Sequence, residues 1–396
     1  MTEASGSAIL RLHSGQRIVD ALFEAHPQRM SRAEVARATG LSKPTVSALM
    51  ADLESAGLVR VAEDDSRSGS IGRPATLYEL VPSAGHCVVA DVGATRLLVG
   101  LADLLGNVIA EVETESGPDA RAALSTLVRV VSSMVTASDS PCHAVCVGVP
   151  GIYRPRLDRV EQSLSLPGFE DLAVAEYLSE EFGTSVFVEN DVNLAALGEL
   201  ACLRDEEGGG DFAAVFAGTG IGLGLVVDGE LYRGGTGSAG ELGSLIVSWP
   251  HEGTAPVTLE DVASAPSIRK RLGQAVEEGR ESALDLAADV GEIFAAASRG
   301  DAAAAAVLDE VASAMALAVS HLCLIADPTR IVFGGPVGAD PLFVATVRDR
   351  LAGLVAVAPE LMASSLGERA TLIGAASMAQ RHVRDSLIAK VLGAQL

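Results

Sequence analysis

The chain has 396 residues, which is too long for one compact hydrophobic core and indicates two or three domains. Hydrophobic residues make up 48% of it, as in ordinary globular proteins, and the net charge of -23 excludes a generally basic coat for nucleic acid. Residues 1–82 carry 9 Lys and Arg against 10 Asp and Glu, whereas the remainder carries 20 against 42. A nearly neutral N-terminal module on an acidic body is compatible with DNA binding.

The cysteine pattern and the hydropathy pattern both indicate a cytoplasmic protein. No signal-peptide pattern and no run of 18 uncharged apolar residues is present, so we expect no membrane contact. The cysteines show no CxxC spacing and no histidine at metal-ligand spacing, which predicts buried thiols in a reducing compartment. These cysteines are Cys87, Cys142, Cys146, Cys202 and Cys323.

Residues 10–60 predict three helices, of which Gln16–Glu24 is the first. The second begins at Ser31, which forms a capping box with Glu34, and closes at Gly40, where glycine permits a left-handed turn. Ser42 caps a third helix whose apolar residues recur at helical spacing. Two short helices joined by a glycine turn predict a helix-turn-helix.

Two strands, Leu58–Val61 and Thr76–Val81, surround a polar loop and predict a wing. The third helix presents small polar side chains near its N-terminus, the end that enters the major groove in this motif. A module that only mediates protein contacts is the alternative, and the small, polar exposed face disfavours it. The residues expected at operator DNA are Ser42, Lys43, Thr45, Ser47, Arg60, Arg67 and Arg73.

The body shows a weak internal repeat of strand, glycine turn and strand. Cys87–Thr95 precedes a second strand at Leu97–Ala102, and Phe212–Gly222 precedes one at Leu223–Val227. Helical stretches follow each unit, including the Ala-rich Ala302–Ile325, whose apolar positions suit a buried helix. The repeat predicts a duplicated α/β fold with a ligand cleft between two lobes.

A carboxylate and two amides lie where the apolar strand Ser185–Val188 gives way to a helix at Leu194–Leu200. These are Asn190, Asp191 and Asn193. Such groups bind hydroxyls, and the carboxylate can take a proton from one of them. An enzyme could use this site to phosphorylate a sugar, and a repressor could use it only to sense that sugar.

Glycine-rich turns follow three of the predicted strands. Glycines there let backbone N–H groups approach an anion closely, and threonine hydroxyls add donors. Together the turns predict a nucleotide cradle, in which Asp91 could hold Mg²⁺ through water. The candidate residues are Asp91, Gly93, Thr95, Gly218, Thr219, Gly220, Gly334 and Gly335.

The order of these motifs resembles the ROK family (repressors, open reading frames, kinases) of the actin-like ATPase, or sugar kinase, superfold. The resemblance implies an α/β chain in three parts: a winged helix-turn-helix at 1–82, a first lobe at 83–190 and a second lobe at 191–375. We expect a C-terminal helix at 376–396 to complete the first lobe. The motifs are Gly148–Gly151, Glu189–Asn193, Gly218–Gly222, Ala239–Gly243, Leu259–Ser264 and Gly334-Gly335.

The resemblance also implies residue roles. Asn190 and Asp191 match the family's sugar-binding amide and catalytic base, and Glu241 and Glu260 match two glutamates that bind sugar hydroxyls. Thr219 matches the ATP phosphate loop, so Mg²⁺-ATP would bind if the protein were an active kinase.

Several positions depart from the family pattern. Ser244 stands where the family carries a zinc-binding histidine, and the cysteine cluster that follows is missing. We therefore predict no structural zinc and no resident cofactor. Ser165 replaces a sugar-contacting amide, and Ala94 replaces a glycine of the first phosphate loop. We expect Ser165 and Ser244 to face the sugar.

These features leave three hypotheses. The first, favoured by the winged helix, is a sugar-responsive regulator, most simply a repressor, that binds DNA as a symmetric dimer or tetramer. The second is an ATP-dependent sugar kinase with an appended DNA-binding domain, in which Asp191 is catalytic. The third is a regulator whose body binds no sugar and serves only for oligomerisation.

Overall fold

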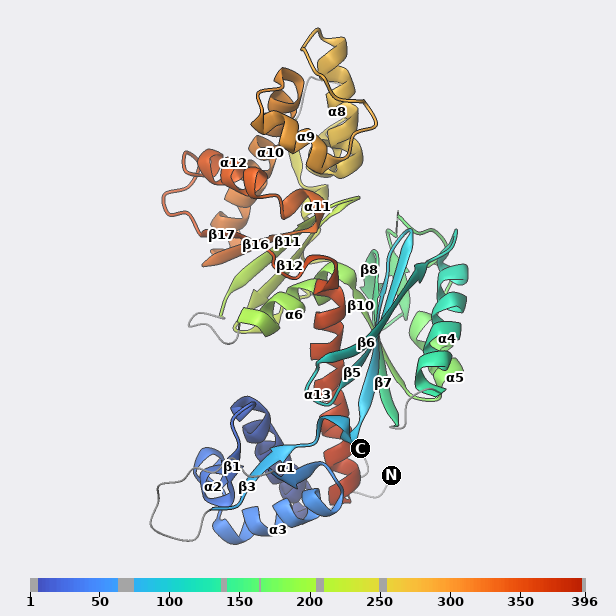
Figure 1. Cartoon of the computed structure of the whole chain (residues 1–396), viewed down its shortest axis with the longest axis vertical. Helices are drawn as coiled ribbons and strands as arrows, with labels where there is room; N and C mark the ends of the chain where they lie inside the picture. Colours follow the sequence, from blue (N-terminus) through green and yellow to red (C-terminus); the bar gives the residue numbers. More distant parts are fainter. Residues whose placement is uncertain are drawn as a thin grey trace.

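The computed structural model describes residues 6–62, 75–136, 141–163, 165–203, 210–248 and 255–393. Three parts follow one another along the long axis: an N-terminal domain, a first lobe and a second lobe (Figure 1). Each lobe is built on a five-stranded sheet. The last helix returns to the N-terminal domain, so the two ends of the described chain both lie there (Figure 1).

The N-terminal domain confirms the predicted helix-turn-helix. The Ser31–Glu34 capping box is present, Gly40 adopts φ +66°, and Ser42 caps the third helix. The first helix begins ten residues before the predicted Gln16, and in this added stretch Leu12 and Gly15 lie against the hydrophobic cluster that includes the C-terminal helix. The elements are α1 (Gly6–Ala25), β1 (Met30–Ser31), α2 (Arg32–Thr39), α3 (Lys43–Ser55), β2 (Val59–Val61) and β3 (Leu77–Leu80), with sheet order β1-β3-β2.

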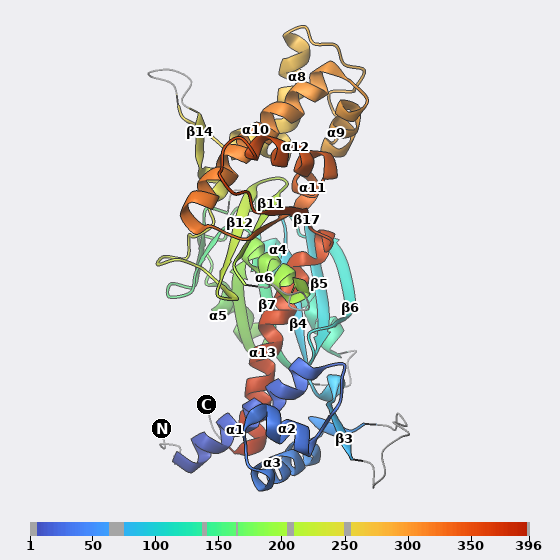
Figure 2. The same ribbon diagram turned by 90° about the vertical axis from the view of Figure 1, so that its left-hand side faces the viewer.

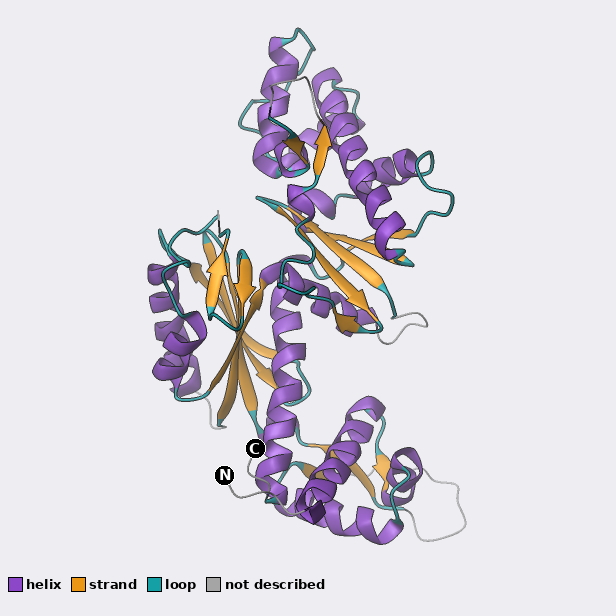
Figure 3. Ribbon diagram, turned by 180° about the vertical axis from the view of Figure 1, so that it is seen from behind, coloured by secondary structure: helices purple, strands orange, loops and turns teal. Residues whose placement is uncertain are grey.

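The first lobe has the sheet order β10-β7-β4-β5-β6, in which β4, β5 and β6 form an antiparallel meander and β4, β7 and β10 run parallel. Helices α4 and α5 cover one face of this sheet and α13 covers the other (Figure 3). The elements are β4 (His86–Val92), β5 (Arg96–Asp103), β6 (Val108–Glu115), α4 (Ala120–Thr136), β7 (Cys142–Val149), β8 (Ile152–Arg154), β9 (Arg159–Glu161), α5 (Val174–Phe182) and β10 (Ser185–Asn190).

The second lobe has the sheet order β17-β16-β11-β12-β13, in which the fifth, fourth, first, second and third strands of the sheet follow one another as they do in the first lobe. This repeat confirms the predicted duplication. Its elements are β11 (Phe212–Ala217), β12 (Ile221–Val227), β13 (Glu230–Leu231), β14 (Ile246–Ser248), β15 (Val257–Thr258), α7 (Glu260–Ala263), α8 (Ala265–Glu277), α9 (Val290–Ser298), α10 (Ala302–Ala326), β16 (Arg330–Gly334), α11 (Gly335–Gly338), α12 (Pro341–Leu351) and β17 (Glu360–Ala363).

Helix α10 supplies much of the second lobe's core. Its inward face includes Val307, Val311 and Met315, which are almost fully buried. The helix is long and apolar enough to pass a length-and-composition test for a membrane span. More than half of its most apolar window is buried against the rest of the lobe, as expected for a core helix.

Helices α6 (Asp191–Leu203) and α13 (Ala370–Leu392) cross closely between the two sheets. Gly198 and Gly374 allow this approach, because a Cβ on Gly374 would lie 1.6 Å from the carbonyl oxygen of Leu194. Helix α13 begins six residues before the predicted start at residue 376. At ~1.5 Å per residue it is ~34 Å long, and it runs from the lobes to α1 (Figures 1 and 2).

The cysteines are only partly as predicted. Cys87 and Cys146 are buried in the first sheet, Cys142 and Cys323 are half-buried, and Cys202 is exposed near the end of α6. The expectation of a buried thiol is therefore wrong for Cys202, which lies on the solvent side of a helix whose other face packs inward.

Candidate functional site

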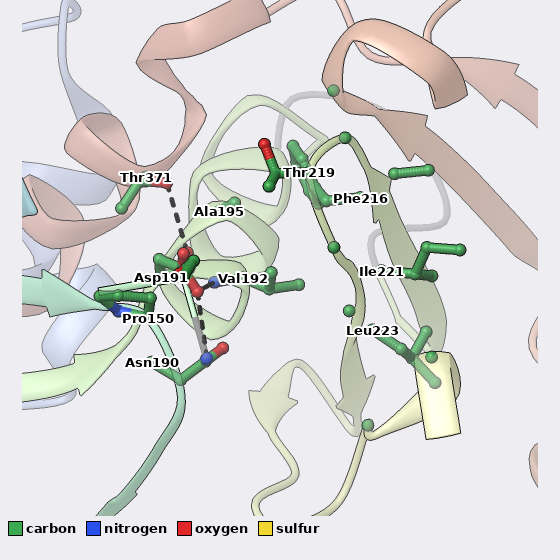
Figure 4. Close-up of a pocket in the computed structure, with 18 of the residues that line it drawn as sticks. Pro150, Asn190, Asp191, Val192, Ala195, Phe216, Thr219, Ile221, Leu223 and Thr371 are labelled. Carbon is green, nitrogen blue, oxygen red and sulfur yellow. Dashed lines mark hydrogen bonds between the residues drawn. The ribbon is translucent and has the colours of Figure 1, made fainter. Parts of the chain in front are cut away.

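A cavity of about 1040 Å³ lies between the two lobes. The loops that follow β4 and β7 and the junction of β10 with the next helix line it from the first lobe, and the β11–β12 turn lines it from the second. The first turn of α13 closes one side. Figure 4 shows Asp191 and Thr371 on one side of this cleft and Thr219 near its rim.

The strand-to-helix junction holds Asn190 and Asp191 firmly. Strand β10 ends at Asn190, and α6 begins at Asp191 without a loop. The Asn190 amide donates to the Gly151 carbonyl at 3.0 Å and to Asp191 Oδ1 at 3.0 Å, and Val192 N also donates to that oxygen at 2.8 Å (Figure 4). Asp191 Oδ2 accepts no hydrogen bond from the described residues and is left for a ligand.

A buried carboxylate, which the sequence analysis did not single out, supports this junction from behind. Glu189 Oε1 accepts hydrogen bonds from Asn190 N at 3.0 Å and from the Asn193 amide at 2.9 Å. Arg233 of the second lobe donates to Glu189 Oε2 at 2.5 Å. An acidic residue ending an apolar strand was the available signal for Glu189, and nothing in the sequence indicated Arg233.

Two cleft aspartates have strongly raised pKa values. Burial, together with the neighbouring Asp191 charge, raises the pKa of Asp91 to about 7, and Arg96 opposes this. Burial raises the pKa of Asp191 to about 6; the backbone N–H of Val192 opposes the rise, and Glu241 adds to it. Asp191 is thus poised to accept a proton near neutral pH.

Most residues of the glycine turns line the cleft, as a nucleotide site there would require. Gly93, Gly218, Thr219, Gly220 and Gly335 line the cleft. The other two predicted members do not. Thr95 is exposed outside the lining, with its carbonyl bonded to Ser116 N, and Gly334 lies in β16 against the ring of Phe216.

The second lobe brings two carboxylates to the same cleft. Glu241 precedes the 3₁₀ turn Leu242–Ser244 and reaches into the cleft, where burial and the Glu260 charge raise its pKa. Glu260 lies in the first turn of α7, and its Oε2 accepts a hydrogen bond from Ile221 N at 3.0 Å. Glu260 therefore braces the β11–β12 turn, a role the sequence did not reveal. Ser165 and Ser244 also line the cleft.

Four of the predicted DNA-binding residues lie at the N-terminal end of α3, and Arg60 lies in β2. Lys43 and Ser47 are exposed and Thr45 is half-buried, while the Ser42 hydroxyl caps the helix by accepting from Thr45 N. Arg60 is also exposed, and its guanidinium pairs with Glu79 at 2.8 Å, so part of its charge is engaged within the domain. Arg67 and Arg73 lie outside the described residues.

No group of three or more His, Cys, Asp or Glu side chains within the described ranges is arranged to hold a metal ion. Residues 249–254, which contain His251, are outside those ranges. The predicted absence of zinc stays a prediction.

Comparison with known proteins agrees with the two-part architecture. Residues 87–382 match the ROK family, and residues 21–63 match the IclR helix-turn-helix domain. A glucokinase of Halalkalibacterium halodurans is 31% identical over 271 residues, which cover 63% of this chain and 80% of the relative. A protein of Caldicellulosiruptor sp. (strain Rt8B.4) named "Putative xylose repressor" is 26% identical over 323 residues, or 77% and 79% of the two chains.

Solved structures show the same fold. A ROK family transcriptional regulator, described as a homologue of the E. coli MLC protein, superposes with a TM-score of 0.81 at 22% identity and covers 98% of this chain and 100% of its own. A ROK family glucokinase of Streptomyces griseus in complex with glucose and AMPPNP has a TM-score of 0.63 at 22% identity, and the match covers 74% of this chain and 99% of the glucokinase chain. The chain belongs to the ROK family and carries an N-terminal helix-turn-helix domain.

Proposed function

We propose that this protein is a transcriptional regulator whose N-terminal domain binds operator DNA and whose cleft binds a sugar or sugar derivative as effector. The ROK body joined to a helix-turn-helix supports this function, as does the likeness to a named repressor over 77% of the chain. The open oxygen of Asp191 offers an acceptor for a sugar hydroxyl, and Asn190, whose two amide N–H groups donate to Gly151 and Asp191, fixes that carboxylate in place.

One observation carries the proposal: a single helix joins the cleft to the DNA-binding domain. At its first turn, the hydroxyl of Thr371 on α13 donates to the Asp191 carbonyl at 3.3 Å. At its other end, the Arg384 guanidinium lies 3.8 Å above the ring of Phe23 on α1, and the Gln16 amide donates to Asp385 at 3.3 Å. A rotation of α13 that accompanies effector binding would therefore move α1.

The consequence for regulation follows from thermodynamic linkage. Sugar binding would favour closure of the lobes around the cleft, and α6 and α13 would shift with them. In a symmetric dimer or tetramer this shift changes the distance between two DNA-binding domains, and hence their fit to two half-sites. Operator and sugar must then change each other's affinity by the same factor.

The test has two stages. The full chain is first used to enrich fragments of the source organism's genomic DNA, and the affinity for an enriched fragment is then measured by fluorescence anisotropy at fixed salt. Each sugar that stabilises the full chain in a thermal-shift screen is added in turn. We expect at least one such sugar to change the DNA affinity. Failure to enrich any fragment, or a DNA affinity that no bound sugar alters, overturns the proposal.

A second candidate function is an ATP-dependent sugar kinase, and the geometry of Asp191 is the observation that favours it. Its pKa of about 6 suits a general base that takes a proton from a sugar hydroxyl. Asp91 and the turn at Thr219 would hold Mg²⁺-ATP, which supplies the phosphoryl group. Asp91 fits this role because its carboxylate accepts no hydrogen bond from the described residues.

The two functions separate in one variant. Asp191→Asn keeps the size and most of the hydrogen bonding of the side chain but removes the base. If sugar-dependent ATP consumption above background is present in the wild type and absent in this variant, the kinase function is supported. If Asp191→Asn still responds to sugar on DNA, catalysis is not part of regulation.

A further inference from the structure

The cleft is strongly acidic, and no free cation within the described lining offsets its charge. Arg96 is the one cationic side chain of the described lining, and its guanidinium already forms an ion pair with Glu368. An occupant with negative charge would meet unscreened carboxylates there. The carboxylates that line the cleft are Asp91, Asp191, Glu241, Glu260, Asp261 and Glu368.

Four of these carboxylates influence one another in sequence across the cleft. Burial is the largest cause of the raised pKa of Asp91, Asp191 and Glu241. A neighbouring negative charge raises each pKa further: Asp191 acts on Asp91, Glu241 acts on Asp191, and Glu260 acts on Glu241. Cations oppose two of these shifts: Arg96 acts on Asp91, and Arg154, which lies outside the lining, acts on Glu241. No cation among the described residues opposes the shift in the pKa of Asp191, which only hydrogen-bond donors lower.

The backbone donors that could hold a phosphate in the glycine turns are partly occupied. Gly93 N donates to the Arg96 carbonyl at 2.8 Å, and Gly218 N donates to the Gly220 carbonyl at 2.9 Å. Ile221 N donates to Glu260 Oε2 at 3.0 Å, which places a carboxylate against the second turn. A phosphate that approached this turn would have to displace that carboxylate or lie beside it.

We propose that the effector is a sugar bearing a protonated amino group and no phosphate, and that Asp191 and Glu241 hold its ammonium. This inference rests on the proposed effector function of the cleft. Glu241 accepts no hydrogen bond from the described residues, and Asp191 keeps one oxygen unused. An ammonium brings three donors and a positive charge to Asp191, which has no cationic neighbour among the described residues, whereas a hydroxyl brings one donor and no charge.

The test is calorimetry on the full chain at pH 7 in EDTA. The ligands are matched sets in the gluco, galacto and manno configurations: hexose, 2-amino-2-deoxyhexose, its N-acetyl derivative and the hexose 6-phosphate. In one configuration we expect the amino sugar to bind at least about tenfold more tightly than the hexose and its N-acetyl derivative, or ~1.4 kcal/mol. We expect the 6-phosphate to bind at least about tenfold more weakly than the hexose, and added salt to narrow both ratios.

Two variants separate charge from shape. Glu241→Gln should bring the ratio of amino sugar to hexose affinity close to one, whereas Glu180→Gln, a surface carboxylate on α5, should leave it unchanged. If a hexose binds and its amino derivative binds no better, or its 6-phosphate binds as well, the inference is overturned while the proposed function stands. If no sugar of any kind binds, both are overturned.

Discussion

The crossing of α6 and α13 makes a quantitative prediction for Gly374→Ala. The new Cβ would lie 1.6 Å from the carbonyl oxygen of Leu194 and 2.5 Å from its carbon. Non-bonded heavy atoms sit about 3.5–4.0 Å apart at their optimum, so the two helices would have to separate by roughly 2 Å. Because the contact is with backbone, no side-chain rotation relieves it.

The magnitude follows from two opposing terms. Overpacking of a core costs about 1–3 kcal/mol and occasionally more, and this contact belongs at the upper end. Alanine in place of glycine in a helix recovers about 1 kcal/mol. A net loss of about 2 kcal/mol corresponds to a fall in Tm of about 2–3 °C for a chain of 396 residues that unfolds as one unit.

The assay is thermal unfolding of the full chain, with Gly273→Ala as the matched control. Gly273 lies inside α8, and a Cβ there meets nothing within 4 Å, so its substitution should leave Tm unchanged or raise it slightly. If Gly374→Ala unfolds at or above the temperature of Gly273→Ala, the close crossing is refuted. Since α6 carries Asp191 and α13 carries Thr371, we also expect weaker effector binding.

Three further predictions concern coupling, pH and DNA. Arg384→Met removes the guanidinium above Phe23, so the ratio of the DNA affinities measured with and without effector should fall several-fold. The effector affinity measured by calorimetry should stay unchanged. An unaltered ratio of DNA affinities contradicts the coupling. The pKa of Asp91 is raised from 3.8 to about 7, so the folded state holds the proton more tightly and stability falls as pH rises between these values. Asp91→Asn should therefore flatten the dependence of Tm on pH from 5 to 8, and a profile as steep as wild type would refute the shift. Lys43→Ala should lower the slope of log affinity against log salt by about 0.9, whereas Lys270→Ala on α8 should not.

Local chemistry explains which elements were predictable. A capping box, a left-handed glycine and an N-cap serine each act within four residues, so Ser31, Gly40 and Ser42 located the helix-turn-helix correctly. The duplicated sheets were predictable for the same reason, because each lobe begins with a hairpin whose strands and turn are contiguous in the chain.

The errors arose where a partner lies far away in the chain. Helix α1 extends ten residues further than predicted, and in this added stretch Gly15 lies against Leu392 of α13, more than 350 residues later in the chain. Thr95 matches the phosphate-loop pattern and yet lies outside the cleft, since turn geometry directs it to solvent. The pairing of Glu189 with Arg233 and that of Glu260 with Ile221 likewise join segments that no local pattern connects.

The sequence by itself determined the DNA-binding domain, the two-lobed body and the candidate residues around Asp191, because these depend on caps, turns and strand alternation along short segments. The family resemblance implied a shared sugar site for Asp191, Glu241 and Glu260, but only the tertiary structure showed that they meet Asp91 in one cleft without a free cation in its described lining, and that α13 links this cleft to α1. Electrostatic interaction depends on distance in space, and four carboxylates spread over 170 residues become an acidic site only when the two lobes face each other.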